Sequence, residues 1–166
     1  MMLRRSLLRV AAAWPATASP RALQPPTGAV LLTVTGAVAT TASDRGVELD
    51  LAQLDAIDRF SFSANTRWHK TRVTFEGTRG DKLMHFLGAT GKEVVATALN
   101  NYISVIPIED FLESGLLLAS RIDGRQLTVR EKGPLWIVYP FDGVPEARLA
   151  VLQSRSVWQL AKLEIR

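Results

Sequence analysis

The sequence contains no cysteine and only two histidines, His69 and His85. Without cysteine the chain forms no disulfide, no thiolate zinc site and no iron–sulfur cluster, and it has no cysteine nucleophile. Two histidines leave little material for a metal site or a Ser-His-Asp triad. The motifs G-x-x-x-x-G-K-[ST], G-x-G-x-x-G, H-E-x-x-H and G-x-S-x-G are also absent. The usual sequence evidence for nucleotide-binding and hydrolytic enzymes is therefore missing.

Acidic residues are missing from the first 43 positions, and this determines where the net charge of +4 lies. Four of the 20 Lys and Arg residues fall within residues 1–24, while the other 16 equal the acidic residues in number. The body of the chain is therefore formally neutral. A nucleic-acid-binding protein needs a basic surplus to neutralise phosphates, so we expect no nucleic-acid partner.

The acid-free start has the features of an export signal. Arginines at 4, 5 and 9 precede the apolar stretch Val10–Trp14, and Ala16–Ala18 offers the small residues of a cleavage site. Because Pro15 keeps the apolar stretch shorter than the usual length of about 7–15 residues, a mitochondrial presequence or a plain tail are the alternatives. We expect residues 1–24 to be a leader and the mature protein to act in the periplasm.

One domain is expected after the leader, over residues 25–166. Prolines and a glycine within residues 19–28 are typical of a linker. The length of the remaining chain suits about one domain. No later apolar run approaches the roughly 18 residues of a membrane span, so we expect none in the mature chain.

Patterns in the body predict short strands and short helices. Asp50 is expected to cap a helix over Leu51–Ile57, Asp81 a helix over Leu83–Leu87 that Gly88 ends, and Pro107 to begin a third. Asp123-Gly124 indicates a hairpin. Because few strands are joined by helical crossovers, the fold class is α+β. The expected strands are Ala29–Thr35, Phe60–Ser63, Arg72–Glu76, Val94–Leu99, Ile103–Ile106, Leu116–Ile122, Leu127–Val129 and Leu135–Tyr139, with loose alternation over Val157–Ile165.

Four polar segments are candidate binding elements, and each also has a structural explanation. Arg130–Pro134 places two cations on a Gly-Pro turn, as an anion clamp or as a solvated turn. Ser154–Leu160 holds Trp158, which either stacks on a heterocycle or fills the core. Asn65–Lys70 is a polar loop in which we expect His69 to be exposed. Asn100–Tyr102 offers amides to a ring edge or merely forms a turn.

A string of segments in order along the chain resembles one family. The segments are Phe75–Gly77, Ala96–Ile108, Leu118–Gly124, Val129–Pro140 and Ser154–Ile165. Together they resemble the oxidoreductase molybdopterin-binding domain, the sulfite-oxidase fold, and most of all its small stand-alone exported members. The resemblance covers about residues 28–166. It implies an α+β domain of mixed β-sheet with short helices.

The sequence departs from that family at two places that matter for function. The enzymes bind molybdenum through a Cys-x-x-Asn segment, which falls here at Phe62–Asn65, without cysteine. They also carry Ser-Val-Lys-Trp-Leu, whose Lys meets the cofactor phosphate; here Trp158 takes the place of that lysine. The first departure removes the thiolate ligand to molybdenum. The second favours an uncharged, unphosphorylated pterin, stacked on Trp158, over phosphorylated molybdopterin.

The resemblance therefore implies a non-catalytic pterin-binding protein. Small members of this kind bind reduced pterins without metal. They act as exported sensors beside the periplasmic domains of membrane-bound proteins that make or break cyclic-di-GMP, or of sensor kinases. The alternatives are a molybdopterin-dependent oxidoreductase with unusual metal ligation and a degenerate protein-interaction module. The residues expected to bind the ligand are Asn65, Trp68, Asn101, Tyr102, Arg130, Lys132, Ser154, Arg155, Ser156 and Trp158.

Overall fold

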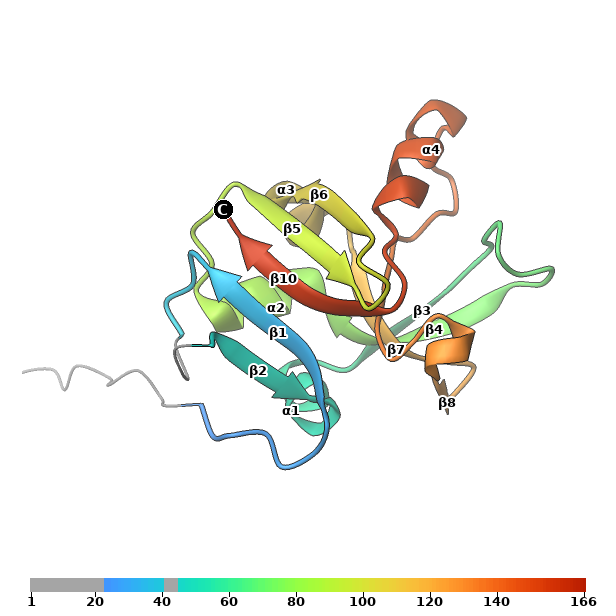
Figure 1. The fold of residues 1–166 in the computed structure, drawn as a ribbon. Coiled ribbons are helices and arrows are strands. Elements are labelled where there is room, and N and C mark those ends of the chain that lie inside the picture. Colours follow the sequence, from blue (N-terminus) through green and yellow to red (C-terminus); the bar gives the residue numbers. More distant parts are fainter. Residues whose placement is uncertain (1–22, 41–44) are drawn as a thin grey trace, which may run out of the picture.

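The computed structural model describes residues 23–40 and 45–166. Residues 1–22 of the expected leader, with its cleavage site, lie outside the described residues. The described part contains ten β-strands, four α-helices and one short 3-10 helix, arranged as Figure 1 shows. Mostly antiparallel strands with a few short helices confirm the α+β class.

Five strands form the first sheet, in the order β2-β1-β10-β5-β6. The first and last strands of the described residues, β1 and β10, pair in parallel, and all other neighbours in this sheet are antiparallel. In Figure 1 the C-terminal strand β10 lies between β1 and β5, at the centre of the sheet. The strands are β1 (Val30–Gly36), β2 (Val47–Asp50), β5 (Glu93–Ala98), β6 (Ile103–Pro107) and β10 (Leu160–Ile165).

The second sheet is antiparallel and contains the hairpin of β7 and β8. Its order is β3-β4-β7-β8, and β9 also pairs with β7. The chain before β10 joins this sheet through a bridge between Trp136 and Trp158, so the two sheets meet at this point. The strands are β3 (Phe60–Ala64), β4 (Val73–Arg79), β7 (Leu117–Ile122), β8 (Arg125–Gln126) and β9 (Trp136–Val138).

Three helices begin or end where the sequence predicts. Helix α1 (Leu51–Ile57) begins at Asp50, whose Oδ1 accepts the N–H of Gln53 at 2.9 Å while Gln53 Oε1 accepts the N–H of Asp50. Helix α2 (Gly80–Leu87) ends at the left-handed Gly88, and α3 (Ile108–Glu113) follows Pro107. Short-range capping interactions are therefore sufficient to set these boundaries.

Two predicted details are wrong. Helix α2 follows Arg79, so Asp81 lies within its first turn and does not cap it. Leu127–Val129 is not a strand, because β8 already forms the second arm of the Asp123-Gly124 hairpin. The chain then enters the 3-10 helix η1 (Val129–Glu131), in which Thr128 and Glu131 cap each other. This local capping interaction replaces strand pairing there.

Two elements have no clear signal in the sequence. Strand β2 has only four residues, too few to show a clear alternation. Helix α4 (Glu146–Arg155) has one buried residue, Leu152, so its apolar periodicity is weak. In Figure 1 α4 projects from the rest of the fold, and it contacts β6, an edge strand of the first sheet.

Apolar side chains pack into two clusters around the sheets. One lies between the first sheet and helices α2 and α3, and it includes Leu32, Leu83 and Leu163. The other lies in the second sheet around Phe75 and Trp136, both completely buried. Burial of apolar area is the main favourable contribution to this fold. Among the described residues, none of the helices combines the length and apolar character that crossing a membrane requires.

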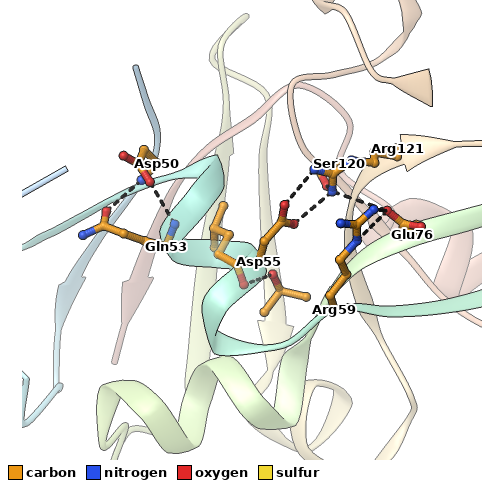
Figure 2. Close-up of polar contacts among 9 residues, drawn as sticks. Asp50, Gln53, Asp55, Arg59, Glu76, Ser120 and Arg121 are labelled. Carbon is orange, nitrogen blue, oxygen red and sulfur yellow. Dashed lines mark hydrogen bonds and ion pairs between the residues drawn. The ribbon is translucent and has the colours of Figure 1, made fainter. Parts of the chain in front are cut away.

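Charged side chains fix α1 to the second sheet. The guanidinium of Arg121 donates to both oxygens of Asp55, at 2.9 and 2.7 Å, and Arg59 donates to Glu76 (Figure 2). The hydrogen bond to Asp55 raises the pKa of Arg121. A bidentate arginine–carboxylate pair of this kind sets orientation as well as adding stability.

Candidate functional site

Three tryptophans from distant parts of the chain meet beside the second sheet, and we call Trp68, Trp136 and Trp158 the tryptophan cluster. The ring centroid of Trp68 lies 5.2 Å from that of Trp136 and 6.2 Å from that of Trp158, with both pairs edge-to-face. Trp136 is completely buried, whereas 38 % of Trp158 is exposed. The cluster therefore has one partly exposed indole, that of Trp158, above the buried indole of Trp136.

Each member of the tryptophan cluster is positioned by a different element. Trp68 lies in the loop between β3 and β4, Trp136 begins β9, and Trp158 lies between α4 and β10. The backbone N–H of Gln159 donates to the carbonyl oxygen of Lys132 at 2.8 Å, which fixes the segment after Trp158. The indole N–H of Trp136 is buried and finds no acceptor in the part of the chain that the structure describes. A polar donor is thus left unpaired at the base of the cluster.

Lys132 lies against this cluster with its charge unpaired. Its backbone adopts a left-handed conformation, with φ of 73°. Its Nζ lies 5.0 Å from the ring centroid of Trp158 and 5.8 Å from that of Trp136. Within residues 23–40 and 45–166 it forms no ion pair. A cation near indole faces gains about 0.5–2 kcal/mol and still has ammonium protons to donate.

A cavity of about 280 Å³ opens beside the tryptophan cluster. Its volume is close to the lower end of the range of about 300–1,000 Å³ for small-molecule sites. The loop before β4, the β7–β8 hairpin and the turn after η1 supply its walls. The lining residues are Trp68, His69, Val73, Ile122, Asp123, Arg125, Gln126, Leu127, Glu131 and Lys132.

A second cavity, of about 430 Å³, lies at the start of α1. Its two carboxylates already have partners, because Asp50 accepts backbone N–H groups and Asp55 binds Arg121. The smaller cavity has charged groups available to a ligand and is therefore the better candidate site.

His69 is half-buried, so the expectation of an exposed loop histidine is wrong. Its ring centroid lies 5.9 Å from that of Trp136 and 6.0 Å from that of Phe75, and Nδ1 lies 2.9 Å from Thr66 Oγ1. Burial, and then the positive charge of Lys132, lower the pKa of His69. The imidazole is consequently neutral at pH 7 and forms part of the aromatic wall of the cavity.

Asp123 brings a carboxylate to the cavity, and it is not among the ligand residues predicted from the sequence. Its Oδ1 accepts the backbone N–H of Thr74 at 2.9 Å, while Oδ2 has no hydrogen-bond partner among the described residues. The Asp-Gly turn signal locates Asp123 at the tip of the hairpin. It does not reveal that the tip folds back toward His69, which follows only from the packing of β4 against β7.

Three of the predicted ligand residues are used in internal contacts. The side-chain amide of Asn65 donates to Asp142 at 3.3 Å. The guanidinium of Arg155 donates to Oδ2 of Asp110 at 2.9 Å, and the Ser156 hydroxyl donates to a backbone carbonyl of α4. These contacts hold the segments around the site rather than facing the cavity.

Four other predicted ligand residues lie on the surface, outside the cavity lining: Asn101, Tyr102, Arg130 and Ser154. The Ser154 hydroxyl donates to the backbone carbonyl of Val151 at 2.7 Å. Asn101 has a φ of 65°, as a turn residue does. The hydroxyl of Tyr102 donates to the backbone carbonyl of Ser154 at 3.0 Å, and Arg130 is exposed in η1. The structure thus brings together Trp68, Lys132 and Trp158, the first two of which line the cavity.

The position at which the resemblance places a metal-ligating cysteine does not fit molybdenum. The ring of Phe62 packs 5.9 Å from that of Phe75, and the Ser63 hydroxyl pairs with that of Thr74. Across the described ranges, no three His, Asp or Glu side chains group as metal ligands. Neither Phe62 nor Ser63 supplies the soft thiolate ligand that the enzymes use.

Comparison with known proteins leaves this site as the basis for inferring function. No protein-family model matches the chain. No curated protein matches it either.

Proposed function

We propose that the chain binds a reduced, unphosphorylated pterin in the cavity beside the tryptophan cluster and does not transform it. Lys132 carries this proposal. This residue lines the cavity, and its ammonium group lies 5.0 Å from the ring centroid of Trp158 and has no ion-pair partner among the described residues. A heterocyclic oxygen or ring nitrogen is the acceptor that such a group lacks.

The remaining lining suits a flat and uncharged ligand. Trp68 and the neutral His69 offer ring faces or edges to a heterocycle. The cations Lys132 and Arg125 are balanced by the two carboxylates of the lining, so the cavity is formally neutral. A phosphorylated cofactor would bring about two further negative charges without a matching surplus of cations.

The resemblance to small members of the sulfite-oxidase fold supports the wider role that we propose. The protein would be exported to the periplasm and would report pterin binding to the periplasmic domain of a membrane-bound signalling protein. That partner would make or break cyclic-di-GMP, or be a sensor kinase. Trp158 lies three residues beyond the end of α4, an exposed helix. A ligand that favours one placement of Trp158 would therefore shift the population of surface conformations available to a partner.

Substitution of Lys132 tests the site. Isothermal titration of 6-methyltetrahydropterin under argon compares the unaltered protein with Lys132→Met. Loss of a charge-assisted hydrogen bond is expected to weaken binding at least about tenfold. Lys162→Met is the matched control, because Lys162 is an exposed lysine of β10 outside the cavity lining, and it should bind as the unaltered protein does. Undiminished binding by Lys132→Met would contradict the placement of the ligand.

A further inference from the structure

We infer that the cavity selects ligands with a 2-amino-4-oxopyrimidine edge and that the Asp123 carboxylate accepts hydrogen bonds from the amino side of this edge. The inference rests on the proposed function and adds to it which chemical edge the protein recognises. It starts from two cavity residues with opposite hydrogen-bonding capacity on separate turns.

Asp123 supplies an acceptor whose orientation is fixed. One carboxylate oxygen accepts the N–H of Thr74 at 2.9 Å, which holds the side chain at the hairpin tip. The other oxygen has no partner among the described residues. An ionised carboxylate accepts hydrogen bonds and donates none. The group that satisfies it must therefore donate, and an amino group beside a ring N–H offers two donors side by side.

Lys132 supplies the opposite capacity from the turn after η1. An ammonium group donates and accepts nothing. His69 lines the same cavity and is affected by both charges. The charge of Lys132 lowers the pKa of His69, and the charge of Asp123 raises it. A ligand that fills the cavity between the two turns must bring donors to Asp123 and an acceptor to Lys132. The 2-amino-4-oxopyrimidine edge carries donors and a carbonyl oxygen side by side.

An analogue with an oxygen in place of the amino group would fail at Asp123. Its carbonyl would face a carboxylate oxygen, leaving two acceptors opposed and one of them without a donor. Sites built to bind a polar group reject analogues that leave their own groups unpaired. Lumazines have a C2 carbonyl and an N1–H where pterins have the C2 amino group and an unprotonated N1, so comparing the two ligands tests these adjoining positions of the edge.

The experiment measures the affinities of 6-methyltetrahydropterin and 6-methyltetrahydrolumazine for the unaltered protein and for Asp123→Asn. The unaltered protein is expected to prefer the pterin at least about tenfold, and Asp123→Asn to lose that preference. Asparagine retains an oxygen for the N–H of Thr74 and tolerates the φ of 49° at this position. Asp142→Asn is the matched control, because Asp142 is also exposed and also accepts a backbone N–H, that of Asn65.

Each outcome distinguishes this inference from the proposed function. Equal affinities for the two ligands, or a preference that survives Asp123→Asn, would overturn the inference and leave pterin binding intact. Binding of neither ligand would overturn both. Guanosine carries the same edge on a smaller ring system. If guanosine binds as tightly as the pterin, recognition of the edge by Asp123 is upheld, and the proposed pterin is replaced by a guanine-type ligand.

Discussion

At the scale of single residues, the candidate site depends on three side chains whose roles follow from their surroundings. Lys132 and Asp123 both have left-handed backbone and lie at turns, where side chains are held without belonging to a strand. The sequence predicts both turns, because Gly-Pro and Asp-Gly are strong turn signals. It does not predict that the two turns face one cavity. The sequence neighbours of His69 predict an exposed side chain, because they do not include the rings of Trp136 and Phe75 that bury it.

The burial of His69 makes stability depend on pH. Its pKa is lower in the folded protein than its ordinary value of about 6.5. As the pH falls below about 6.5, the unfolded chain binds a proton that the folded protein excludes, so the free energy of unfolding decreases until the folded pKa is passed.

We expect His69→Gln to reduce this acid-induced loss. The measurement is the change in Tm between about pH 7.5 and pH 5. His85→Gln, at an exposed position of α2, should retain the full loss. An identical pH dependence in both variants would show that His69 is not kept neutral by burial.

At the scale of elements, α4 is held to the core at its C-terminal end. Arg155, its last residue, donates to Asp110 Oδ2 at 2.9 Å, and the Tyr139 hydroxyl donates to the same oxygen at 2.9 Å. Burial, and then the charge of Asp110, raise the pKa of Tyr139 and keep the phenol protonated as a donor. The sequence makes Arg155 a candidate ligand residue and does not predict its pairing with Asp110. Asp110 lies on α3, 45 residues away, and no local pattern reveals such a pair.

Arg155→Gln should therefore destabilise the fold and loosen the end of α4. Loss of a hydrogen bond to a buried carboxylate is expected to lower the free energy of unfolding by about 1.5–3 kcal/mol, measured by urea denaturation. Arg148→Gln alters an exposed arginine of the same helix and should change stability by less than about 0.5 kcal/mol. Equal effects of the two substitutions would contradict the anchoring role of Arg155.

The pairing of β4 with β7 leaves no space at Gly77. A Cβ there would lie 2.0 Å from the carbonyl oxygen of Leu118 and 2.8 Å from the Cα of Ala119. Gly77→Ala is therefore expected to cost about 3 kcal/mol or more, at the upper end of overpacking penalties, in urea denaturation. Gly28→Ala, whose added Cβ would lie 3.4 Å from its nearest neighbour atom, serves as the control and should cost far less. Near-equal stabilities would contradict the close approach of the two strands.

At the scale of the whole molecule, the elements were more predictable than their assembly. Asp50, Pro107 and Asp123-Gly124 each act within a few residues, so the sequence alone indicates α1, α3 and the hairpin. The parallel pairing of β1 with β10 brings together the two ends of the domain, and no local signal encodes it. The tryptophan cluster is non-local in the same way, because its three members come from separate segments that only tertiary packing joins.

The central claim is that this protein holds a pterin without molybdenum. Native mass spectrometry of protein purified from the cells that produce it, with metal analysis of the same sample, tests the claim most directly. We expect one bound species with the mass of an unphosphorylated pterin and no molybdenum. Molybdenum together with a phosphorylated pterin would contradict the claim and indicate an oxidoreductase. A protein without any bound ligand that also fails to bind added tetrahydropterin would contradict it too, and would favour a protein-interaction module.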